Sequence, residues 1–229
     1  MSDPAGNLAQ ISRRLQLAEA MRSKTGASAA ARLLAVSKTR PAAEIRALAL
    51  LGQHAFGENY AQEAIAKQAE LADLPLEWHL IGHLQSNKAR IAAAAFEWVQ
   101  SVDRIKLVAE LARHRPSGMK PLNVLVQVNI DDEASKSGCR PDDVFALAEA
   151  IAAEPRLALR GLMAIPAPDP DMQRRREAFR ALKRLFDRLG ARYPGIDTLS
   201  MGMSEDFELA IAEGATMVRI GTALFGERS

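Results

Sequence analysis

The sequence predicts a (β/α)8 barrel, an α/β fold in which a closed ring of parallel strands alternates with helices. Short apolar segments typical of strands alternate with amphipathic segments typical of helices, about eight times along the chain. A length of 229 residues is close to the usual size of one such barrel, and a hydrophobic content of 48% is enough for a large core. We therefore expect a single domain over residues 1–229, with an N-terminal helix within 1–26 and the barrel over 32–226.

The apolar pattern gives the order of the elements. Residues 6–23 place apolar side chains at helical spacing, which predicts an opening helix that ends near Gly26. Short apolar runs then predict strands at 32–38, 54–58, 76–82, 98–102, 122–129, 159–165, 198–201 and 217–220. The segments between and after them predict helices at 41–51, 60–72, 86–95, 104–113, 141–152, 172–189 and 205–212.

An open, doubly wound sheet is the alternative arrangement of alternating strands and helices. That fold carries a glycine-rich phosphate-binding turn after its first strand. At the corresponding place this chain reads Ser-Lys-Thr-Arg-Pro, residues 37–41, without a glycine cluster. The barrel is therefore the favoured prediction.

Composition argues against several classes of function. The 30 basic and 28 acidic residues give a net charge of +2, and the run at 174–176 is better explained as a solvated helix face than as a nucleic-acid site. Cys139 is the single cysteine, so the chain has no internal disulfide and we expect a reducing compartment. No apolar run approaches the ~20 residues of a membrane span, and the N-terminus lacks a signal-peptide core. We expect a cytoplasmic protein that binds neither nucleic acid nor membrane.

Lys38 is the first candidate site residue. In a (β/α)8 barrel the active site lies at the carboxyl ends of the strands, and Lys38 ends the first predicted strand after the apolar run 33–36. Partial desolvation at the rim favours the neutral amine, which attacks aldehydes. Taken alone, an exposed lysine that closes a strand is the simpler explanation.

The last two strand ends favour a phosphate site, because loops there bind phosphate in many such barrels. Ser204 precedes a helix expected to open at Glu205, so we expect its hydroxyl to cap that helix and to meet an anion. Gly221 permits close backbone approach, and Thr222 adds a hydroxyl donor. Simple helix capping and a simple turn remain the alternative explanations.

Arg219 shares a strand face with Gly221, two residues further on. A guanidinium at the barrel mouth would donate to a pyridine nitrogen and leave that nitrogen unprotonated. An ion pair with Glu205 or Glu58 is the alternative.

Long motifs that carry a family resemblance follow one another from the first strand to the C-terminus. They are AVSKT (35–39), FGENYAQE (56–63), WHLIGHLQSNK (78–88), VNI (128–130), KSG (136–138), GLMAIP (161–166) and LSMGMSEDFELAIAEGATMVRIGTALFG (199–226). Together they resemble the YggS/PROSC family of pyridoxal phosphate homeostasis proteins, which are related to the N-terminal barrel of alanine racemase.

The resemblance implies a fold type III barrel that holds pyridoxal 5′-phosphate (PLP) as an aldimine, or Schiff base, on Lys38. It implies further contacts from Asn59 and His83 beside the ring, Met163 near the cofactor, Ser204, Gly221 and Thr222 at the phosphate, and Arg219 at the pyridine nitrogen. Some family members carry proline where this chain has His83, which leaves the contact of that side chain open. Members of the family bind, buffer and deliver PLP without turnover, with PLP-dependent apo-enzymes as possible recipients, and we expect a monomer.

Two other functions remain as alternatives: a racemase of the alanine racemase type, and a barrel without PLP that acts on a phosphorylated metabolite. Racemisation needs a base on each face of the cofactor, and in alanine racemases a tyrosine supported by a second, β-rich domain supplies one of them. We expect no such domain here. Tyr60 follows the second strand but belongs to a family motif, and Tyr193 lies at the opposite end of the barrel.

Three other reactive side chains give weaker signals. Lys136, on the loop after the fifth strand, would take PLP transiently during hand-over, although a solvated loop lysine is the simpler interpretation. His79 and His83 straddle a strand end, so they lack the helical spacing of a metal site. Cys139 has no evident base beside it, which argues against a catalytic thiol.

Overall fold

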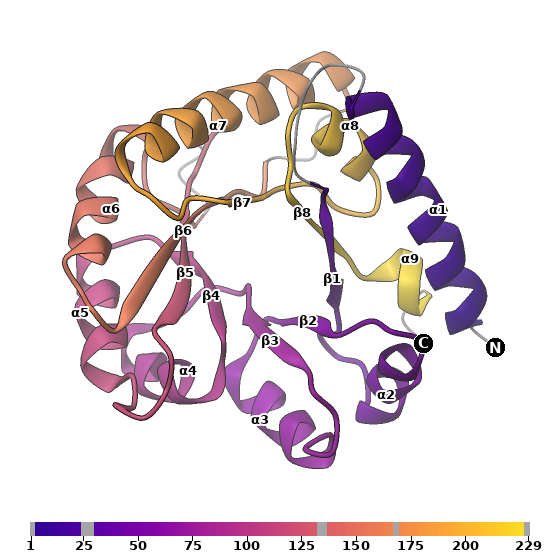
Figure 1. The fold of residues 1–229 in the computed structure, drawn as a ribbon, viewed down its shortest axis with the longest axis horizontal. Coiled ribbons are helices and arrows are strands. Elements are labelled where there is room, and N and C mark those ends of the chain that lie inside the picture. Colours follow the sequence, from indigo (N-terminus) through magenta and orange to yellow (C-terminus); the bar gives the residue numbers. More distant parts are fainter. Residues whose placement is uncertain (1–2, 24–29, 132–136, 167–169, 227–229) are drawn as a thin grey trace.

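The computed structural model describes residues 3–23, 30–131, 137–166 and 170–226. Its strands form a closed barrel in the order β1-β2-β3-β4-β5-β6-β7-β8, and β8 pairs with β1 to complete the ring. Every pairing between neighbouring strands is parallel. The helices follow one another around the outside of this ring (Figure 1). The predicted barrel is confirmed, and the open sheet is wrong.

All predicted strands and helices are present, with ends shifted by a few residues. The strands are β1 (Arg32–Val36), β2 (Ala55–Glu58), β3 (Glu77–Leu80), β4 (Trp98–Val102), β5 (Leu122–Gln127), β6 (Leu157–Met163), β7 (Thr198–Ser200) and β8 (Met217–Ile220). The α-helices are α1 (Pro4–Ser23), α2 (Ala42–Leu50), α3 (Ala61–Glu70), α4 (Ala89–Ala95), α5 (Ile105–His114), α6 (Val144–Ala152), α7 (Met172–Arg192), α8 (Phe207–Ala212) and α9 (Thr222–Phe225). Short 3-10 helices, η1 (Ser86–Lys88) and η2 (Pro141–Asp143), lead into α4 and α6.

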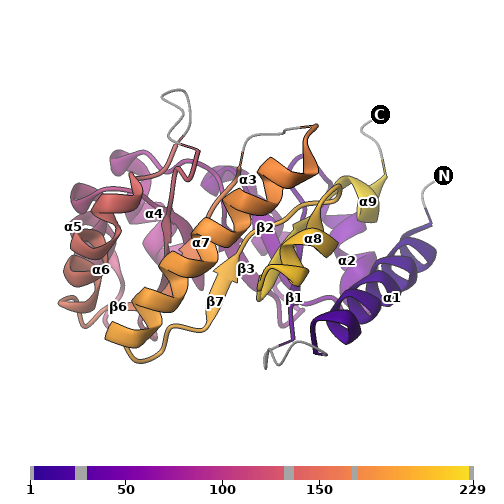
Figure 2. The same cartoon turned by 90° about the horizontal axis from the view of Figure 1, so that it is seen from above.

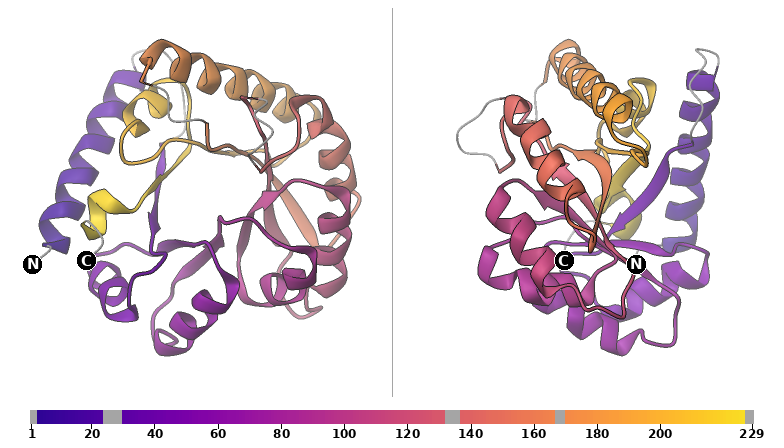
Figure 3. Two further views of the ribbon diagram at one scale, coloured as in Figure 1. Left: turned by 180° about the vertical axis from the view of Figure 1, so that it is seen from behind. Right: turned by 60° about the vertical axis from the view of Figure 1, so that its left-hand side comes forward.

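The main core lies between the strands and the surrounding helices. All residues of β2, β4 and β8 are buried, as is usual for parallel strands covered on both faces. Side views show the helices lying against the outside of the strand layer (Figures 2 and 3). No helix in the described part of the chain has the length and apolar character that a membrane crossing needs.

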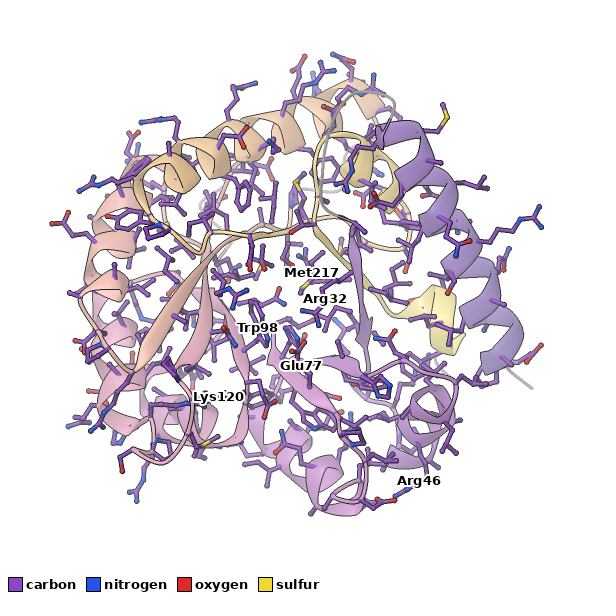
Figure 4. All side chains as sticks on the ribbon, viewed as in Figure 1. Arg32, Arg46, Glu77, Trp98, Lys120 and Met217 are labelled. Atoms are coloured by element: carbon purple, nitrogen blue, oxygen red, sulfur yellow. The ribbon has the colours of Figure 1, made fainter. Side chains whose placement is uncertain are left out.

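The inside of the barrel carries polar as well as apolar side chains. Figure 4 shows Arg32, Glu77, Trp98 and Met217, the first residues of four strands, pointing into the enclosed space. Arg32 pairs with Glu77 at 2.7 Å, and the Trp98 ring stacks on His79 with the ring centroids 5.1 Å apart. Side chains therefore fill the barrel near the amino ends of its strands.

Helix α1 lies outside the ring, against α8 and α9 (Figure 1). The side-chain amide of Asn7 donates to the Leu224 carbonyl at 2.9 Å, and Arg14 pairs with Glu208 at 2.6 Å. These contacts join the two ends of the chain.

Strand β6 begins and ends two residues earlier than predicted, and it is irregular near Gly161. Gly161 has a φ of 144°, and the register between β5 and β6 shifts where it pairs with Leu125. A Cβ atom at Gly161 would lie 2.0 Å from the Thr198 carbonyl oxygen. Glycine is therefore required there for β7 to approach β6.

Candidate functional site

A cavity of about 600 Å³ lies at the carboxyl ends of the strands. Its volume falls in the range of roughly 300–1,000 Å³ that is typical of small-molecule sites. The seven predicted site residues that line it are Lys38, Asn59, His83, Ser204, Arg219, Gly221 and Thr222. They come from the ends of five different strands, so the barrel brings together side chains that are far apart in the sequence. We refer to this space as the mouth cavity.

Met163 is the predicted site residue that does not line the mouth cavity. Its side chain is fully buried within the barrel, in a cluster with Trp98 and Leu125. Its register partner on β5, Gln127, lines the cavity instead.

Lys38 lies two residues beyond the end of β1, in a tight turn, and its side chain is half-buried. The next residue, Thr39, has a φ of 64°, which is unusual for a β-branched residue and costs about 1–3 kcal/mol. The Thr39 backbone N–H donates to the Glu63 carboxylate at 2.6 Å, which holds the turn in this conformation. The neighbours of Lys38 thus fix the point from which its side chain enters the cavity.

A buried ionic cluster also stabilises the turn at Lys38 and Thr39. Lys67 Nζ donates to the Ser37 carbonyl at 2.8 Å, to Glu58 Oε1 at 2.8 Å and to Glu63 Oε1 at 2.7 Å, which uses all three ammonium protons. The Ser37 hydroxyl donates to Glu58 Oε1 at 2.5 Å. Burial raises the pKa of the Glu58 carboxyl, although its bonds from Lys67 and Ser37 oppose that shift. The cluster connects β2 and α3 to both residues that flank Lys38.

Arg219 on β8 is 3% exposed and lies at the inner wall of the cavity. Its Nη1 donates to the Ser200 carbonyl at 2.8 Å and to the Ser200 hydroxyl at 2.7 Å, and its Nη2 donates to the Ala164 carbonyl at 2.8 Å. Burial lowers the pKa of the guanidinium to about 10, so it remains charged at neutral pH. The alternative ion pair with Glu58 or Glu205 is not formed between these described residues.

The region expected to hold phosphate differs from the prediction in one respect. Helix α8 begins at Phe207 and its N-cap residue is Asp206, so the prediction that Ser204 caps this helix is wrong. Residues 204–206 form a turn that moves the helix start, and Asp206 Oδ1 accepts the Met203 N–H at 2.8 Å. Ser204 still lines the cavity.

Gly221 and Thr222 form the other side of this region, where β8 leads into α9. A Cβ atom at Gly221 would lie 3.2 Å from the Val36 carbonyl oxygen and 3.3 Å from the Val36 Cβ. Glycine therefore lets the end of β8 approach the end of β1. Thr222, the first residue of α9, is exposed and adds its hydroxyl to the cavity wall.

Several lining residues were not found from the sequence: Gln127, Ser137, Ile165, Arg175, Met203 and Asp206. Arg175 is the most informative, because it brings a guanidinium to the phosphate side of the cavity, 3.9 Å from Asp206. It belongs to the basic run at 174–176, whose helical spacing marked it as a solvated face. Arg175 lies in the first turn of α7, which follows the carboxyl end of β6, and this position could have indicated that its side chain lines the cavity.

The other reactive side chains lie away from the wall of the mouth cavity. Tyr60 is 65% exposed and lines a neighbouring cavity of about 470 Å³ together with Lys88. Tyr193 follows α7 and lies at the amino end of the barrel. Burial raises the pKa of the Cys139 thiol to about 12, which makes it a poor nucleophile.

In the described segments, no group of three or more His, Cys, Asp and Glu residues is placed to hold a metal ion. Lys136 lies outside the described residues.

The chemistry of the cavity fits PLP. An amine (Lys38) and a buried guanidinium (Arg219) line it from the neighbouring strands β1 and β8, and hydroxyls lie where a phosphate group would be bound. Arg175 and Arg219 supply positive charge for a dianionic ligand, next to the close-packed backbone at Gly221. The cavity volume of about 600 Å³ accommodates a ring of this size.

The chain matches the family described as alanine racemase, N-terminal domain, over residues 7–229. A pyridoxal phosphate homeostasis protein of Pseudomonas aeruginosa is 55% identical over 228 residues, which cover 100% of this chain and 97% of that protein. The protein of the same name from Escherichia coli K12 is 49% identical over 231 residues, covering 100% of this chain and 98% of that protein.

Solved structures give the same result. The structure of PipY from Synechococcus elongatus without PLP has a TM-score of 0.87 at 39% identity, and covers 98% of this chain and 100% of that chain. The structure of PipY with PLP bound has a TM-score of 0.82 at 38% identity and the same coverage. Alanine racemase from Corynebacterium glutamicum, at 18% identity and a TM-score of 0.63, shares the fold over 94% of this chain and 60% of its own.

These matches extend over almost the entire chain and confirm the resemblance that its motifs carry. The chain belongs to the pyridoxal phosphate homeostasis protein family, which is built on the barrel of the alanine racemase N-terminal domain.

Proposed function

We propose that this protein binds PLP in the mouth cavity, with the cofactor aldehyde joined to Lys38, and serves PLP homeostasis by holding and releasing the cofactor. The convergence of seven predicted site residues on one cavity is the observation that carries the proposal. The relatives named pyridoxal phosphate homeostasis proteins, and PipY solved with PLP, support it.

Each residue has a defined role in this proposal. The Lys38 amine condenses with the aldehyde and releases water, and the Glu58–Lys67 cluster holds the turn from which it reaches the cavity. The phosphate is bound by the hydroxyls of Ser204 and Thr222 and by the backbone at Gly221, with the ring beside Asn59 and His83. Arg219 donates to the ring nitrogen, and because it stays charged it does not give that nitrogen a proton.

A carrier without turnover fits this geometry better than a racemase does. Bound PLP supplies electron withdrawal for amino-acid chemistry, and an unprotonated ring nitrogen weakens it. Racemisation also needs a second base facing Lys38, whereas Tyr60 points into the neighbouring cavity and Tyr193 lies at the other end of the barrel. The rim residues His83 (51% side-chain exposure) and Ile165 (40%) are open to solvent, which favours hand-over of a cofactor.

The test compares wild type, Lys38→Ala and Lys88→Ala after each has been incubated with PLP. Lys88→Ala is the matched control, because Lys88 lines the neighbouring cavity. We expect a visible absorption band in wild type and in Lys88→Ala that Lys38→Ala lacks. Borohydride should then attach the cofactor permanently, and peptide mass spectrometry should locate it on Lys38.

A racemisation assay with alanine and other amino acids on the same samples tests the carrier. We expect no enzyme-like turnover. Turnover lost in Lys38→Ala would establish the racemase alternative and overturn the carrier. Wild type that forms no band with excess PLP would overturn PLP binding altogether.

We propose in addition that the protein is a cytoplasmic monomer folded as a single domain, and that PLP-dependent apo-enzymes receive its cofactor. Light scattering should then give a mass near 24.9 kDa, the mass of one chain. Mixing the loaded protein with a PLP-dependent apo-enzyme should restore the activity of that enzyme, and dialysed protein without PLP should not.

A further inference from the structure

A continuous chain of hydrogen-bonded side chains crosses the inside of the barrel from the mouth cavity to the opposite end. Arg219 Nη1 bonds to Ser200 Oγ at 2.7 Å, and Ser200 Oγ bonds to Gln100 Oε1 at 2.7 Å. Gln100 Nε2 lies 3.0 Å from His79 Nδ1, and His79 Nε2 lies 2.8 Å from Glu77 Oε1. We call Ser200, Gln100, His79 and Glu77 the barrel relay.

Chemistry fixes the direction of every bond in the barrel relay. An amide nitrogen can only donate, so His79 Nδ1 accepts from Gln100 and the ring proton sits on Nε2, which donates to the Glu77 carboxylate. Gln100 Oε1 accepts the Ser200 proton, so Ser200 Oγ accepts from Arg219. All donors therefore point the same way, from a buried cation to a carboxylate, and bonds aligned in this way strengthen one another.

Every side-chain nitrogen and oxygen of Ser200, Gln100 and His79 has a hydrogen-bond partner. Ser200, Gln100 and His79 are each 0% exposed, and the remaining Gln100 proton faces Met217 Sδ at 3.2 Å. Burial lowers the pKa of His79, which keeps the ring neutral as the bond from Gln100 requires. Arg32 holds the far end through its 2.7 Å ion pair with Glu77, at the place where Figure 4 shows both side chains inside the barrel.

The guanidinium of Arg219 is the end of this chain that faces the cavity. The Ser200 hydroxyl donates its proton to a hydrogen bond with Gln100 Oε1, so its oxygen is free to accept the hydrogen bond from Arg219. The carbonyls of Ser200 and Ala164 complete its contacts with the strands. Arg219 is therefore held by two backbone carbonyls and by one hydroxyl, and the side chain that orients this hydroxyl, Gln100, does not line the cavity.

We propose that Ser200, Gln100 and His79 are positioning residues that hold Arg219 in the orientation in which it meets the ring nitrogen of PLP. This inference rests on the proposed function. It extends the functional unit from the mouth cavity towards the amino end of the barrel, where β3 begins at Glu77.

Gln100→Met tests the inference, because it keeps the length of the side chain and removes both central links. The Ser200 proton then has no acceptor in the relay, and Arg219 loses a defined partner. We expect PLP affinity to fall about tenfold, the effect of one charge-assisted hydrogen bond. We also expect the visible band of the bound cofactor to shift, because its ring nitrogen loses a fixed donor.

Gln53→Met is the matched control. Gln53 is also a buried glutamine, but its amide donates to the carbonyls of Leu33 and Ala55, outside the relay. We expect it to lower thermal stability without changing PLP affinity or the absorption band. If the two variants change affinity and band equally, the effect is general destabilisation and the relay proposal is wrong.

A double variant shows whether Gln100 acts through Arg219. In an Arg219→Met background, Gln100→Met should change PLP affinity by less than about twofold, because the group that it positions has gone. Independent effects that simply add would overturn the proposal.

A measurement without PLP keeps the relay testable if a variant fails to fold. Nitrogen-15 spectra of the histidine rings in wild type should show His79 neutral and protonated on Nε2 at pH 7. A proton on Nδ1 would overturn the relay even if PLP binds normally. Wild type that shows the expected ring but binds no PLP would instead overturn the proposed function, and with it the role of the relay.

Discussion

Replacing Lys67 by methionine removes the ammonium that neutralises a carboxylate inside the protein. Glu58 is 0% exposed, and Lys67 Nζ lies 2.8 Å from its Oε1 atom. Breaking such a buried pair costs about 3–5 kcal/mol of unfolding free energy, because a charge is left uncompensated. The Thr39 turn should loosen as well, since Lys67 also holds the Glu63 carboxylate that accepts the Thr39 N–H.

The loss should depend on pH in a defined direction. Lys67 lowers the pKa of Glu58 through a hydrogen bond and through its charge, so its removal raises that pKa further above the ordinary value of 4.5. A raised folded-state pKa stabilises the protein below the ordinary value, and this contribution is lost as pH rises towards the folded-state pKa. The stability deficit of Lys67→Met should therefore be larger at pH 8 than at pH 5, with a slope of up to about 1.4 kcal/mol per pH unit for one proton.

Urea unfolding of wild type and variant at the two pH values measures the deficit. The double variant Glu58→Gln with Lys67→Met is the control, because it leaves no buried charge and keeps an acceptor for the Ser37 hydroxyl. We expect it to recover at least half of the lost stability and to show no such pH dependence. A deficit equal at both pH values, or a double variant no better than the single one, would refute the reasoning.

Three other predictions concern single positions. Gly161→Ala should lower the free energy of unfolding, measured in urea, by about 3 kcal/mol or more. The added Cβ would lie 2.0 Å from the Thr198 carbonyl oxygen, and the residue has a φ of 144°. A loss below about 1 kcal/mol would mean that β6 and β7 move apart easily. Cys139 should react slowly with a thiol reagent at pH 8 and rapidly in urea, because its thiol has a pKa of about 12; fast reaction in the native protein would contradict its burial. Phe179→Ala should cost about 3–5 kcal/mol in the same unfolding assay, because Phe179 is a fully buried residue of α7, whereas Met172→Ala, at the exposed first residue of the same helix, should change little.

The fold was predictable because it depends on periodic features of the sequence. Strands such as the β-branched run at 122–127 are buried on both faces, so they appear as continuous apolar segments. The residues that line the mouth cavity were predictable to the extent that they follow strand order, since the carboxyl ends of all strands lie at the same end of the barrel. Lys38 and Arg219 are found in this way even though 181 positions separate their numbers in the sequence.

The misses arise where three-dimensional direction matters more than sequence position. Met163 ends a strand as a site residue should, but it packs inside the barrel and its neighbour Gln127 lines the cavity. Ser204 has the composition of an N-cap, yet a turn delays the helix to Phe207.

The barrel relay was missed for a different reason. Gln100 and Ser200 are single polar residues within apolar strands, and nothing in their neighbouring sequence shows that the two side chains meet at the centre of the barrel.

Helix α9 was also not predicted. At Thr222–Phe225 it is too short to give a periodic signal in the sequence.

The closure of the ring has a consequence for synthesis on the ribosome. β1 pairs with β8, and Arg14 pairs with Glu208, which lies 194 residues later in the chain. The N-terminal elements can therefore reach their final contacts only after the C-terminal elements have been synthesised. Lys38 leaves the exit tunnel early, but it shares a cavity with Arg219 only after β8 has followed. The mouth cavity therefore forms only after β8 has been made and has paired with β1, and the cofactor can enter it only then.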